Sequence, residues 1–292
     1  MAIVSAKEML IKASEEKYAV GAFNITSVVQ MAAVIEAAAG KNAPVIIQTS
    51  VTPAKFLTPE VIVAVFRALS QSVSIPACLH LDHCTDVDFC KKCADQGYTN
   101  IMFDGSHLSF EENIRLTREV SDYCHSIGGI TVEGELGTVS GVEDQIKVAS
   151  DDAQLCDPEK SLEFKERSGI DLFGPAIGTA HGVYQTENPV IDFERLGEIF
   201  QKLNTPVVKT PLVIHGGTGL SELTVRNLIS KGGAKYNVST NLKYILMDST
   251  LEYLSVHMKE YDPGKMDKHV KMATRNRIEY WIDLLGSTGK AI

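Results

Sequence analysis

The sequence predicts an α/β protein with one domain over residues 1–292, a (β/α)8 TIM barrel with extra C-terminal helices. Apolar segments of strand length alternate eight times with segments of helical pattern. Continuous apolar strands are typical of a parallel sheet that is covered on both faces. No Pro- or Ser-rich linker divides the chain, and the glycine signature GxGxxG does not follow the first strand. These observations favour a barrel over a doubly wound, dinucleotide-binding sheet.

The elements follow one another in regular order. The expected strands cover residues 19–25, 44–50, 77–85, 100–106, 131–136, 172–178, 212–215 and 235–238. The expected helices cover residues 27–39, 59–73, 86–96, 110–127, 158–168, 192–203, 221–230 and 241–260, with another at 265–285 outside the repeat and an amphipathic one before the first strand. Residues 137–157 show no apolar period, and long structureless insertions of this kind are usually functional.

The composition limits the possible partners. The net charge of −9 argues against broad nucleic-acid binding, so a site for a phosphorylated ligand must be built locally. No segment reaches the ~20 continuous apolar residues of a membrane helix. Charges interrupt the apolar pattern of the first twenty residues, which is atypical of a signal peptide. We expect a cytoplasmic protein that binds neither nucleic acid nor membrane.

Six cysteines include one CxxC pair, Cys90 and Cys93. A zinc ribbon would need a second pair. Because the pair falls within a predicted helix, we expect it to lie on a partly buried helix face rather than in a redox or metal site.

Polar side chains collect where the predicted strands end. These residues are Asn24, Thr49, Ser50, Asp82, His83, Asp104, Ser106, His107, Glu135, His181, His215, Gly216, Gly217, Asn237, Ser239 and Thr240. In a barrel, the carboxyl ends of the strands form the catalytic face. An interior strand cannot bury an unpaired carboxylate cheaply, so Asp82 and His83 are expected at the open end of the third strand.

Three histidines, His83, His181 and His215, follow the third, sixth and seventh strands. Each alone could be a hydrogen-bonded structural residue. Three imidazoles that converge from different strands instead make a catalytic zinc site with an open position for substrate. We expect His80, which lies inside a strand, to have a structural or supporting role.

Two glycine-rich turns give a second signal. The first is GTAHG at residues 178–182, and the second is GGTG at residues 216–219, which leads directly into a predicted helix. Bare backbone amides at a helix N-terminus bind phosphate. Either turn could be an ordinary turn, but the neighbouring histidines and the strand end NVST at residues 237–240 favour a phosphate site.

The motifs HLDHC, MFDGSH, VEGELG, AIGTAHGVY, VIHGGTGL and NVST, in this order, resemble the class II, metal-dependent ketose-bisphosphate aldolases over nearly the whole chain. The resemblance implies one catalytic zinc ion on the three histidines, with Asp104 and Glu135 at positions used by a second or displaced metal. It implies that Asp82 is the acid/base at the C4 hydroxyl of the substrate. It also implies that Glu143, in a mobile loop, moves the C3 proton.

The same resemblance implies a ketose-phosphate site accompanied by a monovalent cation, Na⁺ or K⁺. The residues assigned to substrate binding are Asn24, Ser50, Gly182, Gly216, Gly217, Thr218, Asn237, Ser239, Thr240 and Arg275. Arg275 or Arg277 would hold a distal phosphate, because an acidic protein must supply cationic groups locally. The alternative for these two arginines is a solvated helix face. Thr218 and Tyr236 depart from the family, which commonly has Ser and a small aliphatic residue at these positions.

The implied reaction is reversible cleavage of a ketose 1,6-bisphosphate, of fructose or tagatose type, to dihydroxyacetone phosphate and glyceraldehyde 3-phosphate by a homodimer or homotetramer. The ending GSTGKA also resembles members that act on other ketose 1-phosphates, of inositol-pathway or sugar-acid type. A non-catalytic partner subunit is a further alternative. A Schiff-base aldolase would need a lysine inside the barrel. None is predicted there, because Lys235 begins its strand and Lys209 precedes one.

Overall fold

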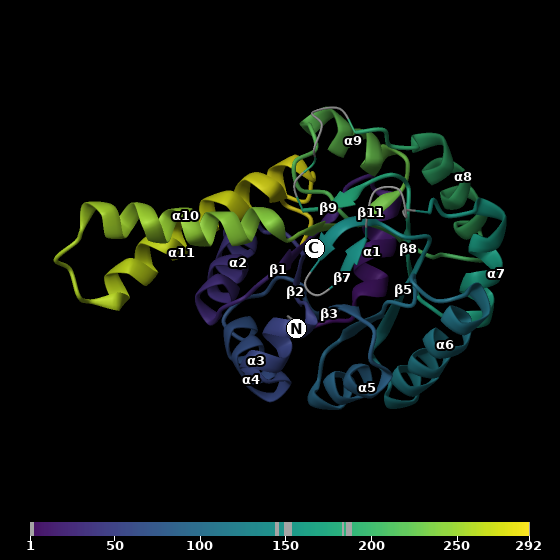
Figure 1. Cartoon of the computed structure of the whole chain (residues 1–292), viewed down its shortest axis with the longest axis horizontal. Coiled ribbons are helices and arrows are strands. Elements are labelled where there is room, and N and C mark those ends of the chain that lie inside the picture. The colour runs from purple at the N-terminus through teal and green to yellow at the C-terminus, as the bar shows by residue number, and fades with distance from the viewer. Residues whose placement is uncertain (1–2, 144–145, 149–153, 183, 185–188, 292) are drawn as a thin grey trace.

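The computed structural model describes residues 3–143, 146–148, 154–182, 184 and 189–291, with only the backbone described for 142, 143 and 146–148. Eight parallel strands close into a barrel in the order β1-β11-β10-β8-β5-β4-β3-β2. Helices surround it, and two long helices project to one side (Figure 1). The predicted (β/α)8 barrel with extra C-terminal helices is therefore confirmed.

The strands and helices lie close to their predicted positions. The barrel strands are β1 (Val20–Asn24), β2 (Val45–Thr49), β3 (Ala77–Cys84), β4 (Asn100–Phe103), β5 (Thr131–Leu136), β8 (Leu172–Pro175), β10 (Leu212–Ile214) and β11 (Gly233–Val238). The helices are α1 (Ala6–Glu15), α2 (Val28–Gly40), α3 (Val51–Leu57), α4 (Pro59–Ser70), α5 (Val87–Gln96), α6 (Phe110–Ile127), α7 (Pro158–Ser168), α8 (Phe193–Leu203), α9 (Glu222–Ser230), α10 (Thr240–Val256) and α11 (Pro263–Leu284).

Two features differ from the sequence prediction. The short helix α3 was not expected, because its seven residues begin with β-branched side chains and contain a proline. The segment expected to be structureless contains a hairpin, β6 (Ser140–Glu143) and β7 (Ile146–Val148), and β6 pairs with β9 (Ala180–His181). Strands of two to four residues are too short to show a period in the sequence, and they form here through pairing with a distant segment.

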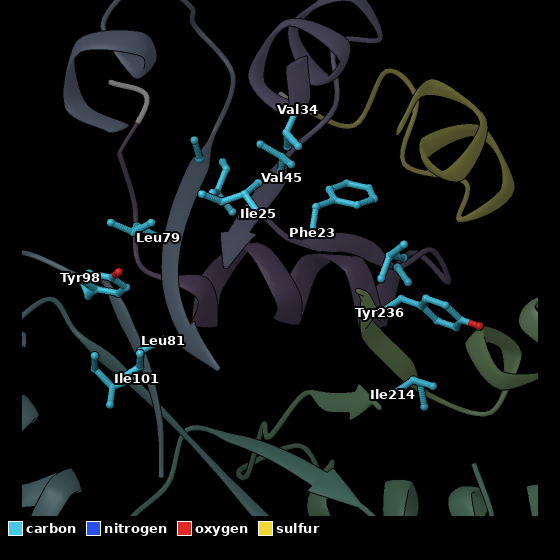
Figure 2. Packing of buried hydrophobic residues seen from close by; sticks show 14 of the residues in the cluster. Phe23, Ile25, Val34, Val45, Leu79, Leu81, Tyr98, Ile101, Ile214 and Tyr236 are labelled. Carbon is cyan, nitrogen blue, oxygen red and sulfur yellow. The ribbon is translucent and has the colours of Figure 1, made fainter. Parts of the chain in front are cut away.

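The barrel interior changes from apolar to polar along its axis. At the amino ends of the strands, a small apolar cluster packs against α1; its strand members are Val20, Ala22, Ile46, Cys78, Leu172, Val213 and Ala234. Side chains that point outward form a larger apolar layer under the helices, and Figure 2 shows part of it, including Phe23, Leu79, Tyr98 and Tyr236. The polar groups that remain lie toward the carboxyl ends of the strands, which positions the site there.

Cys90 and Cys93 are buried on α5, as predicted. None of the described helices combines the length and the apolar composition that crossing a membrane requires.

Candidate active site

Eleven of the residues predicted for the site line one pocket at the carboxyl ends of the strands. They are Asn24, Asp82, His83, His181, Gly182, Gly216, Gly217, Thr218, Asn237, Ser239 and Thr240. These residues come from both ends of the sequence, and closure of the barrel brings them together. The placement agrees with the catalytic face expected for this fold.

A bulge in β3 lets Asp82 and His83 face the same pocket. Consecutive residues of a strand normally point to opposite sides. In the pairing with β4, Leu81 lies opposite Ile101 and Cys84 opposite Phe103, so two residues of β3 face one of β4. His83 adopts a φ of +48°, in the left-handed region, and non-glycine residues held in this conformation cluster at functional sites. Bulges of this kind re-aim side chains at barrel rims.

The three predicted metal ligands are adjacent. The Nε2 atom of His83 lies 2.8 Å from the Nδ1 atom of His215. The ring of His181 lies 4.8 Å from that of His83 and 5.9 Å from that of His215, measured between centroids. One nitrogen from each residue falls within 4.8 Å of the others. Three imidazole nitrogens with a free side toward a pocket suit a catalytic zinc ion.

A second group of potential ligands adjoins the first through His83. The Nδ1 atom of His83 is hydrogen bonded to Asp104 Oδ2 at 2.8 Å, and Glu135 Oε2 lies 3.9 Å from the same nitrogen. Glu135 Oε2 is buried and has no hydrogen-bond partner among the described residues. Burial, and then the charge of Asp104, hold the pKa of Glu135 well above its usual range. A buried carboxylate oxygen without a partner fits a position next to a cation.

The electrostatic environment differs among the three histidines. Burial lowers the pKa of His215, and burial together with the other two imidazoles lowers that of His181 well below its usual range. Both are then neutral and able to ligate a metal. Burial also disfavours protonated His83, but Asp82 and Asp104 hold its pKa well above the usual range. Metal binding must therefore displace a proton from His83.

Amide groups fix the carboxylate of Asp82. Its Oδ2 atom accepts hydrogen bonds from Asn24 Nδ2 at 2.8 Å and Gln48 Nε2 at 3.2 Å, and Asn237 Nδ2 lies 3.4 Å from Oδ1. Burial raises the pKa of Asp82, but the neighbouring cationic groups, His83 first, bring it well below the usual range. Asp82 is therefore an oriented, ionised carboxylate at the pocket wall.

A buried layer beneath the pocket was not predicted. His215 Nε2 is hydrogen bonded to Glu133 Oε1 at 3.1 Å, and Lys235 Nζ donates to Glu133 Oε2 at 2.8 Å. Lys235 Nζ also lies 3.2 Å from His80 Nε2, which is 3.6 Å from Asp82 Oδ1. This layer contacts one predicted metal ligand, His215, and the carboxylate of Asp82 from below, and polar contacts of this kind tune metal sites.

The expectation that no lysine lies inside the barrel is wrong. Lys235 is fully buried. The strand β11 begins at Gly233, two residues earlier than predicted, and its register with β10 shifts between Leu212 and Val213. Lys235 thus sits inside the barrel beneath Asn237 rather than at its rim, and it is paired with Glu133.

Three other predicted residues lie away from the pocket wall or cannot be placed. Ser50 is buried at the end of β2, where α3 begins. The guanidinium of Arg275 donates to Glu279 and lies beside Gly40 at the end of α2, at the opposite end of the barrel from the pocket. The backbone of Glu143 belongs to β6, but its side chain lies outside the described residues.

We expect the Glu133→Gln variant to bind zinc about 10–100-fold more weakly than the wild type, because His215 loses its charged partner. Competition with a chelator of known affinity measures this, and Glu111→Gln on the exposed face of α6 is the matched control. The Glu133→Gln/Lys235→Met double variant removes both buried charges. It should unfold at higher urea than the single variant and still bind zinc weakly. Zinc affinity within twofold of the wild type in both variants would contradict the assigned role.

The chain resembles known aldolases over its full length. Residues 4–290 match the family described as "Fructose-bisphosphate aldolase class-II". The fructose-bisphosphate aldolase of Staphylococcus aureus (strain Mu50) is 37% identical over an alignment of 294 residues that covers 100% of both chains.

Solved structures of aldolases are also similar to this chain. The YdjI aldolase from Escherichia coli K12 is 30% identical, with a TM-score of 0.85 over 99% of this chain and 100% of that chain. A fructose-bisphosphate aldolase from Campylobacter jejuni is 24% identical and shares the fold, with a TM-score of 0.84 over 99% and 97%. The family match spans nearly the whole chain, and the three histidines, Asp82 and the glycine-rich turns lie on one face of the barrel. The chain therefore belongs to the class-II fructose-bisphosphate aldolases, a family of metal-dependent lyases.

Proposed function

We propose that this chain is a zinc-dependent aldolase that reversibly cleaves a ketose 1,6-bisphosphate, of fructose or tagatose type, to dihydroxyacetone phosphate and glyceraldehyde 3-phosphate. The observation that carries the proposal is the convergence of three imidazoles, one oriented carboxylate and two glycine-rich turns on one pocket. The name of the Staphylococcus aureus relative supports the fructose type.

The residues of the chain have distinct roles in this reaction. His83, His181 and His215 would hold the metal, which supplies Lewis-acid polarisation of the substrate ketone when bound. Asp82 takes the proton of the C4 hydroxyl as the bond between C3 and C4 breaks, and returns it in the reverse direction. Asn24 and Gln48 both donate to the Oδ2 atom of Asp82, whereas Oδ1 accepts a longer hydrogen bond from Asn237 at 3.4 Å and keeps a lone pair for that proton.

Imine chemistry has no support in the geometry of Lys235. A Schiff-base lysine must be able to attack the substrate carbonyl as a free amine. The Nζ atom of Lys235 is instead tied to Glu133 and His80, and Lys235 does not line the pocket. Treatment with borohydride in the presence of substrate should leave the enzyme active.

Substrate choice is tested by a panel. Separate assays of the purified chain with fructose 1,6-bisphosphate, tagatose 1,6-bisphosphate and other ketose 1-phosphates distinguish these candidates. The two bisphosphates differ only in configuration at C4 and give the same products, so their cleavage rates are compared, whereas the other ketose 1-phosphates release a different aldehyde. A chain that needs a second protein for any turnover would instead be a partner subunit. The ionised Asp82 and the clustered histidines support an active enzyme in its own right.

Four further features stay predictions. They are the monovalent cation, the single domain over 1–292, the cytoplasmic location and the contact of Arg275 with a distal phosphate.

We expect Asp82→Ala to keep about one zinc ion per chain while losing cleavage by ~10²-fold or more, the usual scale for a positioned acid/base. Metal analysis and a coupled cleavage assay measure the two quantities. Chelation should abolish wild-type activity, and zinc should restore it. Asp88→Ala, an exposed carboxylate on α5, is the control. Loss of zinc from the Asp82 variant would show that Asp82 only orients a ligand.

We expect Glu143→Ala to suppress exchange of the C3 proton of dihydroxyacetone phosphate with solvent when no aldehyde is present. The strand β6 pairs through Gly141 with His181, so its backbone runs next to a metal ligand. Closure of such a segment over substrate can deliver a carboxylate while excluding water. Zinc content should stay normal, and Glu166→Ala on α7 should exchange like the wild type. Unchanged exchange in the Glu143 variant would assign the proton to another base.

A homodimer or homotetramer is supported by the arm formed by α10 and α11, which projects from the barrel (Figure 1). Buried residues of α10, among them Leu242 and Tyr253, face the protein. The opposite side of α10 carries Tyr244, Met247, Leu251 and Leu254 at alternating spacings of three and four, all about half exposed or more. A helix that is apolar on two sides is normally covered on both.

The exposed stripe suits a second copy of the chain. Its spacing is that of a coiled-coil seam, which packs against an identical seam, and Tyr and Met are enriched at interface cores. With Met258 and Tyr261 beyond the helix, six large side chains, each 46–88% exposed, would form the apolar core of such an interface. A polar rim around this core would complete the ~800 Å² per partner of a stable interface.

We expect Leu251→Glu to reduce the oligomer to a smaller species, because each seam would bury a charge without a partner. Sedimentation equilibrium measures the mass. Val207→Glu, at a position 91% exposed and outside the arm, should leave the mass unchanged. A monomeric wild type, or a Leu251 variant of unchanged mass, would exclude this surface as the interface.

A further inference from the structure

Two tyrosine hydroxyls hold successive carbonyl groups of the GGTG turn. Tyr184 Oη donates to the carbonyl oxygen of Gly216 at 2.6 Å, and Tyr236 Oη donates to that of Gly217 at 2.8 Å. The two tyrosines come from different parts of the chain, one after β9 and the other from β11. Two adjacent peptide planes of the turn are therefore fixed by side chains that do not belong to it.

The direction of each carbonyl sets the direction of the next amide. In a trans peptide, the C=O of one residue and the N–H of the next point to opposite sides, and none of the described peptide bonds is cis. The amide of Gly217 therefore points away from Tyr184, and the amide of Thr218 points away from Tyr236. Neither amide has a hydrogen-bond partner among the described residues.

The packing around Tyr236 directs one of these amides to the pocket. Tyr236 is buried in the outer layer, between the barrel and the helices (Figure 2), with its ring 5.7 Å from that of Trp281. A Cβ atom on Gly217 would lie 2.3 Å from the Tyr236 ring, so the turn rests directly on it. With the Gly217 carbonyl held toward this outer layer, the Thr218 amide faces the opposite, pocket side.

Tyr184 links the two glycine-rich turns. Its oxygen accepts a hydrogen bond from the amide of Ala180 at 3.0 Å while it donates to Gly216. The position of the second turn is thereby tied to the residue before His181. Burial raises the pKa of Tyr184 to about 12 and that of Tyr236 well above its usual value, so both hydroxyls remain donors over the working pH range.

The pocket next to these amides contains one further polar atom of interest, Asn237 Oδ1. Asn237 Oδ1 is buried, lines the same pocket and has no hydrogen-bond partner among the described residues. Such groups are costly unless a ligand or water satisfies them. The Thr218 amide and the Asn237 side chain thus face a position that a polar ligand would occupy.

We propose that Tyr184 and Tyr236 are positioning residues that aim the amides of Gly217 and Thr218 at the phosphate group of the substrate. This inference rests on the proposed function, which supplies a phosphorylated ketose. Successive amides held in one direction form an anion-binding concavity. Because Tyr236 replaces the small aliphatic residue common in the family, its hydroxyl would be a contribution of this chain's own sequence.

The test uses the zinc-loaded enzyme and the variants Tyr184→Phe and Tyr236→Phe, which remove only a hydroxyl. Tyr98→Phe is the matched control, since it removes another buried hydroxyl, bonded to Thr49 at 2.9 Å outside the pocket. Calorimetric titration with inorganic phosphate and with dihydroxyacetone phosphate measures binding. Each test variant should bind both about 5–10-fold more weakly, as expected for amides that lose their orientation. The control should bind like the wild type, and zinc content should be equal in all four proteins.

Steady-state kinetics gives a second readout. The KM for the phosphorylated ketose should rise in both test variants by a similar factor, while kcat stays within about twofold. A purely structural role would lower the melting temperature without this split. Wild-type affinity in both test variants would overturn the inference and leave the proposed function standing. A wild type that binds neither phosphate compound would instead reject the phosphate site itself.

Discussion

The buried ion pair between Glu133 and Lys235 lies where the barrel interior changes from apolar to polar, and the geometry of the site depends on it. Both side chains are fully buried, and charges in such a place persist only when each is compensated. Glu133 also bonds His215, and Lys235 reaches Asp82 through His80. One pair of charges thus helps to orient both a predicted metal ligand, His215, and the carboxylate of Asp82 at the pocket. A substitution of Glu133 or Lys235 would therefore change the orientation of His215 and Asp82, although neither charged side chain lines the pocket.

Strand alternation places this layer, and the bulge in β3 departs from that alternation. Glu133 lies two residues before Glu135, so both point inward. Asp82 and His83 are consecutive and would point apart in a regular strand. The bulge at their position, with the left-handed backbone of His83, brings both to the mouth. The strain at His83 is held by the hydrogen bond to Asp104, and such strain is typical of sites that need a fixed orientation.

The sequence was sufficient for the barrel and most of the pocket wall, because long apolar runs that end in polar residues mark both strands and site. It was insufficient for α3 and for the β6–β7 hairpin, which are short and depend on tertiary contacts. The layer below the pocket carried a readable signal. Gln48, His80, Glu133 and Lys235 each lie two residues before a predicted site residue. In a strand, the residue two positions before an inward-pointing residue also points inward. This alternation, continued toward the amino end of each strand, would have placed these four side chains inside the barrel.

The position of Arg275 shows a different limit. Its place in an expected helix was right, but a sequence pattern cannot say which face of that helix meets which neighbour. In the structure it pairs with Glu279 beside α2, far from the pocket of its own chain. A contact that depends on packing between distant helices, or on a second copy, leaves no periodic signal in one segment. Only residues whose position follows from the strand geometry could be assigned reliably.

The mouth of the barrel brings together buried polar groups whose proximity destabilises the folded chain. Glu135 carries a buried oxygen that has no hydrogen-bond partner in the part of the chain that the structure describes, next to the negative charge of Asp104, and three imidazoles lie close to one point. The hydrogen bonds of the closed barrel and the apolar layers below hold the backbone in place despite these unfavourable contacts. Functional sites commonly reduce the stability of a fold in this way. A cation that binds only the folded chain stabilises it by mass action, more strongly the tighter it binds. The arrangement that destabilises the folded chain without metal therefore also provides the affinity for a bound metal.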